Sequence, residues 1–273
     1  MPVQPSSHHS SAPPLRLGSV SFLNARPLIY GLEEAPGIEV KLDVPSRLLD
    51  GLIDGRFDVA LLPIIDYQRV AGLRLLTSGG IGCDGPTLTV RIFSSTPIEQ
   101  IQTLACDTDS HTSVALARVM LAEQFQIRPE FVPLDASHTR GDAARLLIGD
   151  KVVCEEPRDL PYQLDLGEAW KRQTGLPFVF AAWTARAGVE LGDLPQKLIA
   201  ARRLGLAQVD SIVAAHAVPR GWPAHIAREY LTRNLKYDIG LRDLEAIRLF
   251  HRLTYRHGLA PHPPRELDVV HAS

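Results

Sequence analysis

The sequence is poor in cysteine and has almost no net charge. Its three cysteines, Cys83, Cys106 and Cys154, are widely spaced and form no C-x-x-C pair. This pattern argues against a disulfide framework and a zinc knuckle, and it favours a reducing compartment. The formal net charge of -2 lacks the excess of Lys and Arg with which nucleic-acid-binding proteins neutralise phosphates. We therefore do not expect a nucleic acid as a partner.

Long apolar runs are also missing. No stretch approaches the roughly 18 to 20 apolar residues that span a membrane. Residues 1–14 are polar and rich in Pro and Ser, without the basic start and the apolar run of a secretory signal. We expect these residues to form a disordered tail, and we expect a cytoplasmic protein with no membrane partner.

Several motifs of catalysis and cofactor binding are absent as well. The sequence has no G-x-S-x-G elbow and no P-loop, and its C-terminal histidines lack H-E-x-x-H spacing. A G-x-G-x-x-G pattern occurs at Gly80, Gly82 and Gly85, but Pro86 and a β-rich run follow it where a dinucleotide site needs a helix. The glycines therefore predict turns, and we expect neither a metal nor a cofactor.

The sequence does contain short β-like runs that alternate with helical patterns. Strands are expected at residues 15–22, 38–44 and 58–62, with helices from about residue 27 and over residues 46–54. Ser46 is the expected cap of the second helix, and Gly55 is expected to end it. This alternation predicts an α/β protein with a mostly parallel sheet, and a hydrophobic fraction of 45% supplies its core.

Two stretches of the chain look like copies of one unit. Residues 48–61 and residues 143–154 each read as a short helix, a glycine turn and an apolar strand, so that we expect a helix over 143–148 and a strand over 151–154. Two copies favour two similar lobes. A single doubly wound sheet, which also contains such repeats, is the alternative.

The predicted lobes are discontinuous in sequence. An extended segment at residues 86–95 provides one crossing between them, and residues 178–184 provide the return. Helical patterns at 224–234 and 241–256 are expected to pack back on the first lobe. We therefore predict that residues 15–92 and 185–273 form lobe 1, that residues 93–184 form lobe 2, and that a ligand binds in the cleft between them.

The segment S-V-S-F-L-N-A-R-P-L, residues 19–28, marks the first candidate site. A strand delivers Ser21 and Asn24 to its carboxyl end, where open parallel sheets bind ligands, and Pro27 can begin the next helix. The free backbone N–H groups of a helix start favour an anion. The alternative is that Asn24 merely caps the helix.

The segment D-T-D-S-H-T-S, residues 107–113, repeats this arrangement in the second lobe. A strand ends, hydroxyl side chains follow, and an apolar helix begins. Ser110, Thr112 and Ser113 are suited to hold a carboxylate, although they could equally form an N-cap with nothing bound. Two such sites on opposite sides of one cleft favour the binding interpretation.

These segments resemble those of the chorismate dehydratases of the futalosine route to menaquinone. The resemblance extends through D-V-A-L-L-P-I-I-D-Y, C-D-G-P-T-L-T-V-R-I-F-S and D-L-G-E-A-W-K-R-Q-T-G-L-P-F-V-F-A-A-W, and it covers nearly all of the chain after residue 15. It implies a periplasmic-binding-protein-like (type II) fold. It also implies a hydro-lyase that converts the dicarboxylate chorismate to 3-enolpyruvyl-benzoate and water, the first step of this route.

The resemblance also suggests roles for individual residues. Asn24 would be catalytic, hydrogen-bonding the departing hydroxyl or the enolpyruvyl group, while the substrate's own enolpyruvyl carboxylate removes the ring proton. The family usually has S-R-T-S where this chain has Ser110-His111-Thr112-Ser113, so a permanent cation is replaced by a group that is mostly neutral near pH 7. The residues expected to bind substrate are Ser21, Arg26, Pro63, Gly85, Thr89, Ser110, His111, Thr112 and Ser113.

Two other functions stay open at this point. A 1,4-dihydroxy-6-naphthoate synthase of the same pathway would share the fold, but the S-P-C-P-N-D-like stretch expected in its first loop is missing. A non-catalytic cytosolic solute-binding protein would show the same strand and helix pattern, because fold does not determine function.

Overall fold

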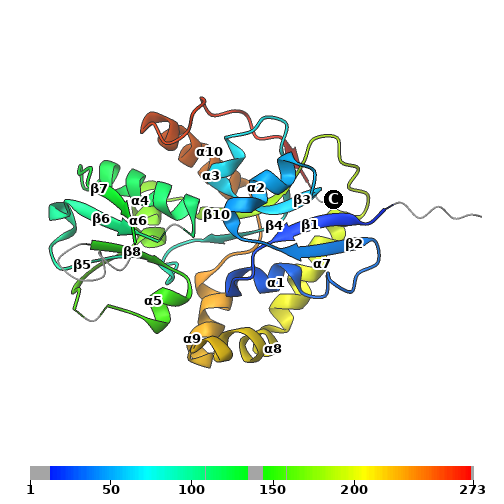
Figure 1. The fold of residues 1–273 in the computed structure, drawn as a ribbon, viewed down its shortest axis with the longest axis horizontal. Helices are drawn as coiled ribbons and strands as arrows, with labels where there is room; N and C mark the ends of the chain where they lie inside the picture. Colours follow the sequence, from blue (N-terminus) through cyan, green and yellow to red (C-terminus); the bar gives the residue numbers. More distant parts are fainter. Residues whose placement is uncertain (1–12, 108, 135–143, 158, 272–273) are drawn as a thin grey trace, which may run out of the picture.

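Two β-sheets, each flanked by helices, lie side by side in the computed structural model (Figure 1), which describes residues 13–107, 109–134, 144–157 and 159–271. The larger sheet has the strand order β11-β4-β10-β3-β1-β2. Its strands are β1 (Leu15–Ser19), β2 (Ile38–Leu42), β3 (Val59–Pro63), β4 (Arg74–Cys83), β10 (Phe178–Ala185) and β11 (Val269–Val270). The smaller sheet has the order β7-β6-β8-β5-β9. Its strands are β5 (Val90–Ser94), β6 (Thr103–Cys106), β7 (Glu130–Pro133), β8 (Ala144–Ile148) and β9 (Tyr162–Asp165).

Both sheets are mixed. In the larger sheet β1 pairs in parallel with β2 and β3, whereas β10 runs antiparallel to β3 and β4. In the smaller sheet β6 is parallel to β7 and β8, and β5 is antiparallel to β8 and β9. The helices are α1 (Arg26–Ile29), α2 (Pro45–Ile53), α3 (Ile64–Tyr67), α4 (His111–Gln124), α5 (Asp150–Cys154), α6 (Leu166–Thr174), α7 (Leu194–Ala207), α8 (Val209–Ile212), α9 (Ala224–Glu229) and α10 (Leu241–Arg256).

The chain passes between the sheets twice, after β4 and before β10. The predicted α/β class with two lobes is therefore correct, although antiparallel β10 and β5 make the sheets mixed where a mostly parallel sheet was expected. The extended crossing at residues 86–95 contains β5. The return segment, β10, pairs with β3 and β4 of the larger sheet. The exact boundaries of the two lobes stay a prediction, and most of the expected tail, residues 1–12, lies outside the described residues.

The repeat expected at residues 143–154 is wrong. Residues Ala144–Ile148 form strand β8, and Asp150–Cys154 form helix α5, so helix and strand are exchanged relative to the prediction. A short apolar run fits the residue period of a helix as well as that of a strand, and the tertiary context decides which one forms. Here the run lies between β5 and β6 in the sheet. The turn after it uses Gly149, whose φ of 60° is a conformation that glycine readily adopts.

Helix α2 begins one residue earlier than expected. Val44 is its N-cap residue and Pro45 occupies the first turn, where the missing N–H costs nothing. Ser46, the expected cap, is therefore inside the helix. The expected end is correct, because Gly55 follows the C-cap with a φ of 72°.

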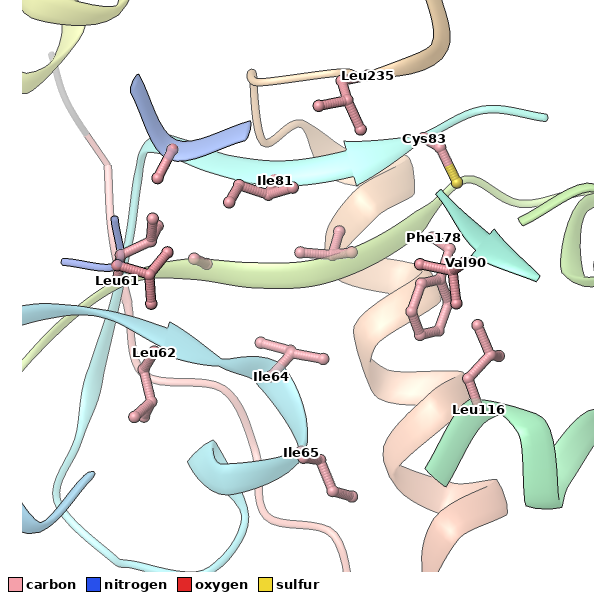
Figure 2. Packing of buried hydrophobic residues seen from close by; sticks show 14 of the residues in the cluster. Leu61, Leu62, Ile64, Ile65, Ile81, Cys83, Val90, Leu116, Phe178 and Leu235 are labelled. Atoms are coloured by element: carbon pink, nitrogen blue, oxygen red, sulfur yellow. The ribbon is translucent and has the colours of Figure 1, made fainter. Parts of the chain in front are cut away.

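The apolar core is continuous from one sheet to the other. Figure 2 shows Phe178 of β10 beside Val90 of β5, with Leu116 of α4 beyond it, and the same apolar cluster includes Leu61 and Leu62 of β3. The Phe178 ring packs edge-on against Trp170 of α6 at 5.1 Å and against Phe250 of α10 at 5.0 Å between ring centroids. These aromatic contacts place α6, β10 and α10 in one cluster.

The C-terminal helix α10 joins both halves of the molecule, whereas the sequence predicted packing on the first lobe alone. It contacts β10 of the larger sheet and α4, which packs on the smaller one. His257, which follows α10, has Nε2 2.7 Å from Oε1 of Glu123 in α4. Among the described parts of the chain, no helix is long and apolar enough to cross a membrane.

One buried carboxylate organises the first crossing between the sheets. Asp165, the N-cap of α6, accepts hydrogen bonds from the backbone N–H groups of Gly167 at 3.0 Å and Glu168 at 3.1 Å. It also accepts from Thr87 at 3.0 Å and Leu88 at 2.8 Å. Leu88 has a φ of 68°, a left-handed conformation that is costly for a leucine. The Asp165 carboxylate therefore holds the crossing segment in a strained conformation, which we call the Asp165 clamp.

Replacing Asp165 by Asn is expected to destabilise the protein. The amide keeps the side-chain shape but turns one acceptor oxygen into a donor that faces backbone N–H groups, so the free energy of unfolding should fall by about 3 kcal/mol. Urea denaturation measures this change. Asp193→Asn is the matched control, because Asp193 is exposed and forms a surface ion pair with Lys197. Equal stability of Asp165→Asn and Asp193→Asn would contradict the proposed importance of the clamp.

The buried His251 is expected to make stability depend on pH. Burial lowers the pKa of His251 from 6.5 to about 4, partly offset by a hydrogen bond to the Ile64 carbonyl. The contribution of neutral His251 to the free energy of unfolding is therefore fully present above pH 6.5. It falls as the pH drops towards 4, because the unfolded chain gains a proton that the folded protein does not, a loss of about 3 kcal/mol. Urea denaturation at pH 7 and pH 4.5 should show a clearly smaller loss for His251→Gln; the same loss in both proteins would refute the assignment.

Candidate active site

A pocket opens between the two sheets. Its empty volume is about 1030 Å³, including space open to solvent. One wall is apolar and includes Leu61, Ile81 and Leu235, which lie around β4 and β10 in Figure 2. The polar groups come from the loop after β1, the crossing segment, the start of α4, the start of α5 and the C-terminal quarter. Such a mainly apolar pocket with a few polar groups is typical of small-molecule sites.

Asn24 lines this pocket from the larger sheet. It lies inside a 3-10 turn, Leu23–Ala25, and the N-cap residue of α1 is Ala25, with no side-chain capping bond. Asn24 is therefore not a helix cap, which removes the alternative role considered from the sequence. Its Oδ1 is buried and has no hydrogen-bond partner among the described residues.

The helix start expected to hold an anion beside Asn24 is weaker than predicted. Helix α1 has only the four residues Arg26–Ile29, too few to build up a substantial helix dipole. What the loop after β1 offers the pocket is therefore chiefly the Asn24 carboxamide itself.

Ser110 and Ser113 line the pocket from the smaller sheet. Ser110 is the N-cap of α4, and its Oγ accepts a hydrogen bond from the Ser113 N–H at 3.2 Å. The two hydroxyl oxygens are 2.9 Å apart. The cap and the pocket wall are thus formed by the same residues, at the positive end of a 14-residue helix.

The two residues between these serines are not part of the pocket wall. His111 Nδ1 lies 3.2 Å from Oδ2 of Asp66, and the buried Thr112 Oγ1 accepts from the Ile65 N–H at 3.5 Å. Both contacts join α4 to α3. His111 and Thr112 therefore hold the two helices together, and their expected contacts with substrate stay a prediction.

Some of the other expected binding residues line the pocket, and the rest lie outside its wall. Pro63 and Thr89 line the pocket. The Ser21 carbonyl accepts from Arg26 at 3.3 Å and from Arg220 at 3.0 Å, and neither Ser21 nor Arg26 forms part of the pocket wall. Gly85 lies outside it as well, in the crossing segment. The pocket thus brings together five of the expected residues: Asn24, Pro63, Thr89, Ser110 and Ser113.

Lys151 is a pocket residue that the sequence analysis missed. Its Nζ lies 2.6 Å from Oδ2 of Asp107 and 3.3 Å from Oδ2 of Asp109. Burial lowers the pKa of Lys151, but the hydrogen bond and charge of Asp107, followed by those of Asp109, raise it further, so the net pKa is above its ordinary value. The ammonium is therefore charged at neutral pH. The exchange of helix and strand at residues 144–154 concealed this position.

Tyr230 and Trp222, from the C-terminal quarter, were also missed. The Thr89 hydroxyl donates to the Tyr230 hydroxyl oxygen at 2.9 Å. Burial raises the pKa of Tyr230 to about 12, against the lowering effect of hydrogen bonds from Thr89 and Asn24. Trp222 stacks on the Tyr230 ring at 5.3 Å, and its Nε1 donates to Oδ1 of Asp150 at 2.7 Å. No local motif indicates these contacts, which join residues far apart in sequence.

The charged groups of the pocket lie on the side of the smaller sheet. They are the carboxylates of Asp107, Asp109 and Asp150 and the ammonium of Lys151. Over the described residues, no three His, Cys, Asp or Glu side chains are grouped so as to hold a metal ion. The described groups can therefore hydrogen-bond, orient and balance charge around a ligand.

Sequence comparisons agree with this geometry. A family model described as "Menaquinone biosynthesis" matches residues 15–256. The chorismate dehydratase of Thermus thermophilus is 28% identical over 260 residues, covering 87% of this chain and 94% of that protein. The chorismate dehydratase of Campylobacter jejuni is 28% identical over 174 residues, covering 61% of this chain and 66% of that protein.

Structural comparisons identify the fold. A crystal structure of a protein from Archaeoglobus fulgidus has a TM-score of 0.72 at 16% identity, covering 92% of this chain and 100% of its own. The periplasmic aliphatic sulphonate-binding protein of Escherichia coli has a TM-score of 0.68 at 16% identity, covering 94% of this chain and 91% of its own. The predicted two-lobed periplasmic-binding-protein-like fold is thereby confirmed.

Proposed function

The chain belongs to the menaquinone biosynthesis family, and we propose that it is a chorismate dehydratase, a hydro-lyase that converts chorismate to 3-enolpyruvyl-benzoate and water. The observation that carries this proposal is that Asn24 and the Ser110–Ser113 turn, from different sheets, line one pocket. Relatives that align with most of the chain are chorismate dehydratases, which gives the pocket a substrate to be tested.

The pocket suits a small cyclic dicarboxylate. One carboxylate would lie at the start of α4, where the Ser110 and Ser113 hydroxyls and the helix dipole favour negative charge. The Lys151 ammonium would attract the same end of the substrate, in competition with Asp109. The ring would pack on the apolar wall that includes Leu61 and Ile81.

The reaction needs orientation more than it needs strong acids or bases. The ring C–O bond breaks, the hydroxyl leaves as water, and the electron pair of a ring C–H bond completes the aromatic ring. Asn24 has no ionisable group, so its role is to hydrogen-bond the departing hydroxyl. The proton acceptor would be the substrate's own enolpyruvyl carboxylate, as the family resemblance implies, held in place by the pocket, and this proton would pass to the departing hydroxyl to complete the water molecule.

We further propose that the protein works in the cytoplasm. The described cysteines are free, and Cys83 and Cys106 are buried thiols, which suits a reducing compartment.

Conversion of chorismate tests the function directly. Purified protein should consume chorismate and release 3-enolpyruvyl-benzoate, followed by ultraviolet absorbance and product mass. Binding of chorismate without conversion would favour a solute-binding protein. Conversion only of the cyclised futalosine-derived substrate would identify a 1,4-dihydroxy-6-naphthoate synthase.

Asn24→Ala should remove most of the activity without unfolding the protein. Loss of one oriented hydrogen-bond donor in an active site lowers turnover by about 100-fold or more, and the circular dichroism spectrum should not change. Asn234→Ala is the matched control, because Asn234 donates to the Pro86 carbonyl at 3.2 Å and does not line the pocket. Near-wild-type turnover by Asn24→Ala would reject the catalytic assignment.

Lys151→Met should mainly weaken substrate binding. If the ammonium attracts a carboxylate equally in the ground and transition states, KM should rise by about tenfold while kcat changes little. Lys171→Met is the control, since Lys171 also forms an ion pair, with Asp84, but lies outside the pocket wall. Steady-state kinetics measure both variants, and an unchanged KM for Lys151→Met would rule out this contact.

A further inference from the structure

We propose that His111 is a positioning residue, whose hydrogen bond to Asp66 holds the pocket walls from the two sheets at the spacing that the substrate needs. The consequence of this inference for substrate binding rests on the proposed function. The contact between His111 and Asp66 is a property of the protein itself, and it can be tested without substrate.

Two neighbouring contacts tie helix α3 to the start of helix α4. His111 Nδ1 lies 3.2 Å from Oδ2 of Asp66, and the Thr112 hydroxyl accepts from the Ile65 N–H at 3.5 Å. Helix α3 directly follows β3 of the larger sheet, and α4 follows β6 of the smaller one. These two contacts, which we call the α3–α4 bridge, therefore join parts of the chain that belong to different sheets.

The bridge lies between residues of the pocket wall. Pro63, the last residue of β3, immediately precedes α3 and lines the pocket. In α4, the pocket residues Ser110 and Ser113 directly flank the two residues of the bridge. The bridge therefore sets how far the Ser110–Ser113 turn stands from the β3 side of the pocket.

The Asp66 carboxylate depends on this contact. Its side chain is 1% exposed. Arg69 Nη1 lies 3.1 Å from its Oδ1, but among the described residues this oxygen has no hydrogen-bond partner. A buried charge is costly unless it is both paired and hydrogen-bonded. His111 supplies the hydrogen bond at Oδ2, so undocking α4 from α3 would leave the buried carboxylate without it.

The contact also assigns a proton to one atom of the His111 ring. A carboxylate that is paired with an arginine only accepts hydrogen bonds, so Nδ1 of His111 must be the donor. Which ring nitrogen of a histidine is protonated follows from the hydrogen bonds that the ring makes. The bridge therefore predicts that Nδ1 keeps its proton even when the ring is neutral.

Nuclear magnetic resonance of protein labelled with ¹⁵N-histidine tests the contact without substrate. Long-range correlations between ring protons and ring nitrogens distinguish a protonated Nδ1 from a bare one. His111→Ala assigns the His111 signals among the ten histidines. At about pH 9, where an ordinary histidine is neutral, His111 should carry its proton on Nδ1. Asp66→Ala should remove this preference.

Kinetics with chorismate test the positioning role. His111→Ala should raise KM about tenfold and leave kcat within a factor of about two, because the wall then occupies its binding position for only a fraction of the time. His111→Asn should restore most of the loss, since its amide N–H can take the place of Nδ1–H. Adding Asp66→Ala to His111→Ala should raise KM little further, because both variants remove the same bond.

His257→Ala is the matched control. His257 Nε2 lies 2.7 Å from Oε1 of Glu123, so this histidine also ties α4 to another segment through a carboxylate. The contact is near the opposite end of α4, and neither residue lines the pocket. His257→Ala should therefore lower the melting temperature, as the loss of a structural contact does, and leave KM unchanged.

Each outcome decides the proposal. A neutral His111 ring with a bare Nδ1 in the wild-type protein overturns the contact, whatever the kinetics show. A wild-type KM for His111→Ala overturns the positioning role, as does an equal rise of KM in His257→Ala. If His111→Ala does not fold, His111→Asn assigns the signals and Asp66→Ala carries the kinetic test.

Failure of the proposed function can be told apart from failure of the bridge. Wild-type protein that binds chorismate without converting it refutes the proposed function, and the dissociation constant then replaces KM in the same comparison of variants. Wild-type protein that does not bind chorismate refutes both the proposed function and the positioning role, while the protonation of Nδ1 still decides the contact with Asp66.

Discussion

The carboxylate of Asp165 is the interaction on which the arrangement of the pocket most depends. It caps α6 and at the same time accepts hydrogen bonds from the Thr87 and Leu88 N–H groups, and so joins the start of a helix to the segment that crosses between the sheets. The next residue, Thr89, donates to Tyr230, which lines the same pocket as Asn24. One buried acceptor thus supports a series of contacts that reaches the wall of the pocket. Hydrogen bonds to a charged acceptor are strong enough to stabilise the left-handed conformation of Leu88.

The pocket also contains more negative than positive side chains. The carboxylates near α5 outnumber the single ammonium of Lys151, yet the proposed substrate is a dianion. The pairs that Lys151 forms with Asp107 and Asp109 keep the cation in the pocket and hold it charged. A carboxylate ligand would have to compete with Asp109, the more exposed of its two partners. Such competition favours a ligand that also gains from the α4 start and the apolar wall, and it disfavours small anions.

Much of the fold and part of the pocket could be predicted from the sequence. Strand β3 and helix α4 follow clear apolar patterns, and the polar residues after β1 and β6 indicate where Asn24 and Ser110 lie. The exchange of β8 and α5 was missed because a run of five residues does not distinguish a helix from a strand when it is buried in the middle of a sheet. That error also concealed Lys151. His111 could be located in the α4 start, but its orientation towards Asp66 depends on the packing of α3 and α4. Tyr230 could not be predicted, because its contact with Thr89 joins residues 141 positions apart.

The most direct test of the account is a crystal structure of Asn24→Ala grown with chorismate, since this variant should bind the substrate without converting it. The account predicts intact chorismate between the two sheets, with one carboxylate within hydrogen-bond distance of Ser110 or Lys151 and the ring hydroxyl facing the space left by the Asn24 side chain. Chorismate bound elsewhere, or bound in the pocket with its hydroxyl turned away from residue 24, would contradict it.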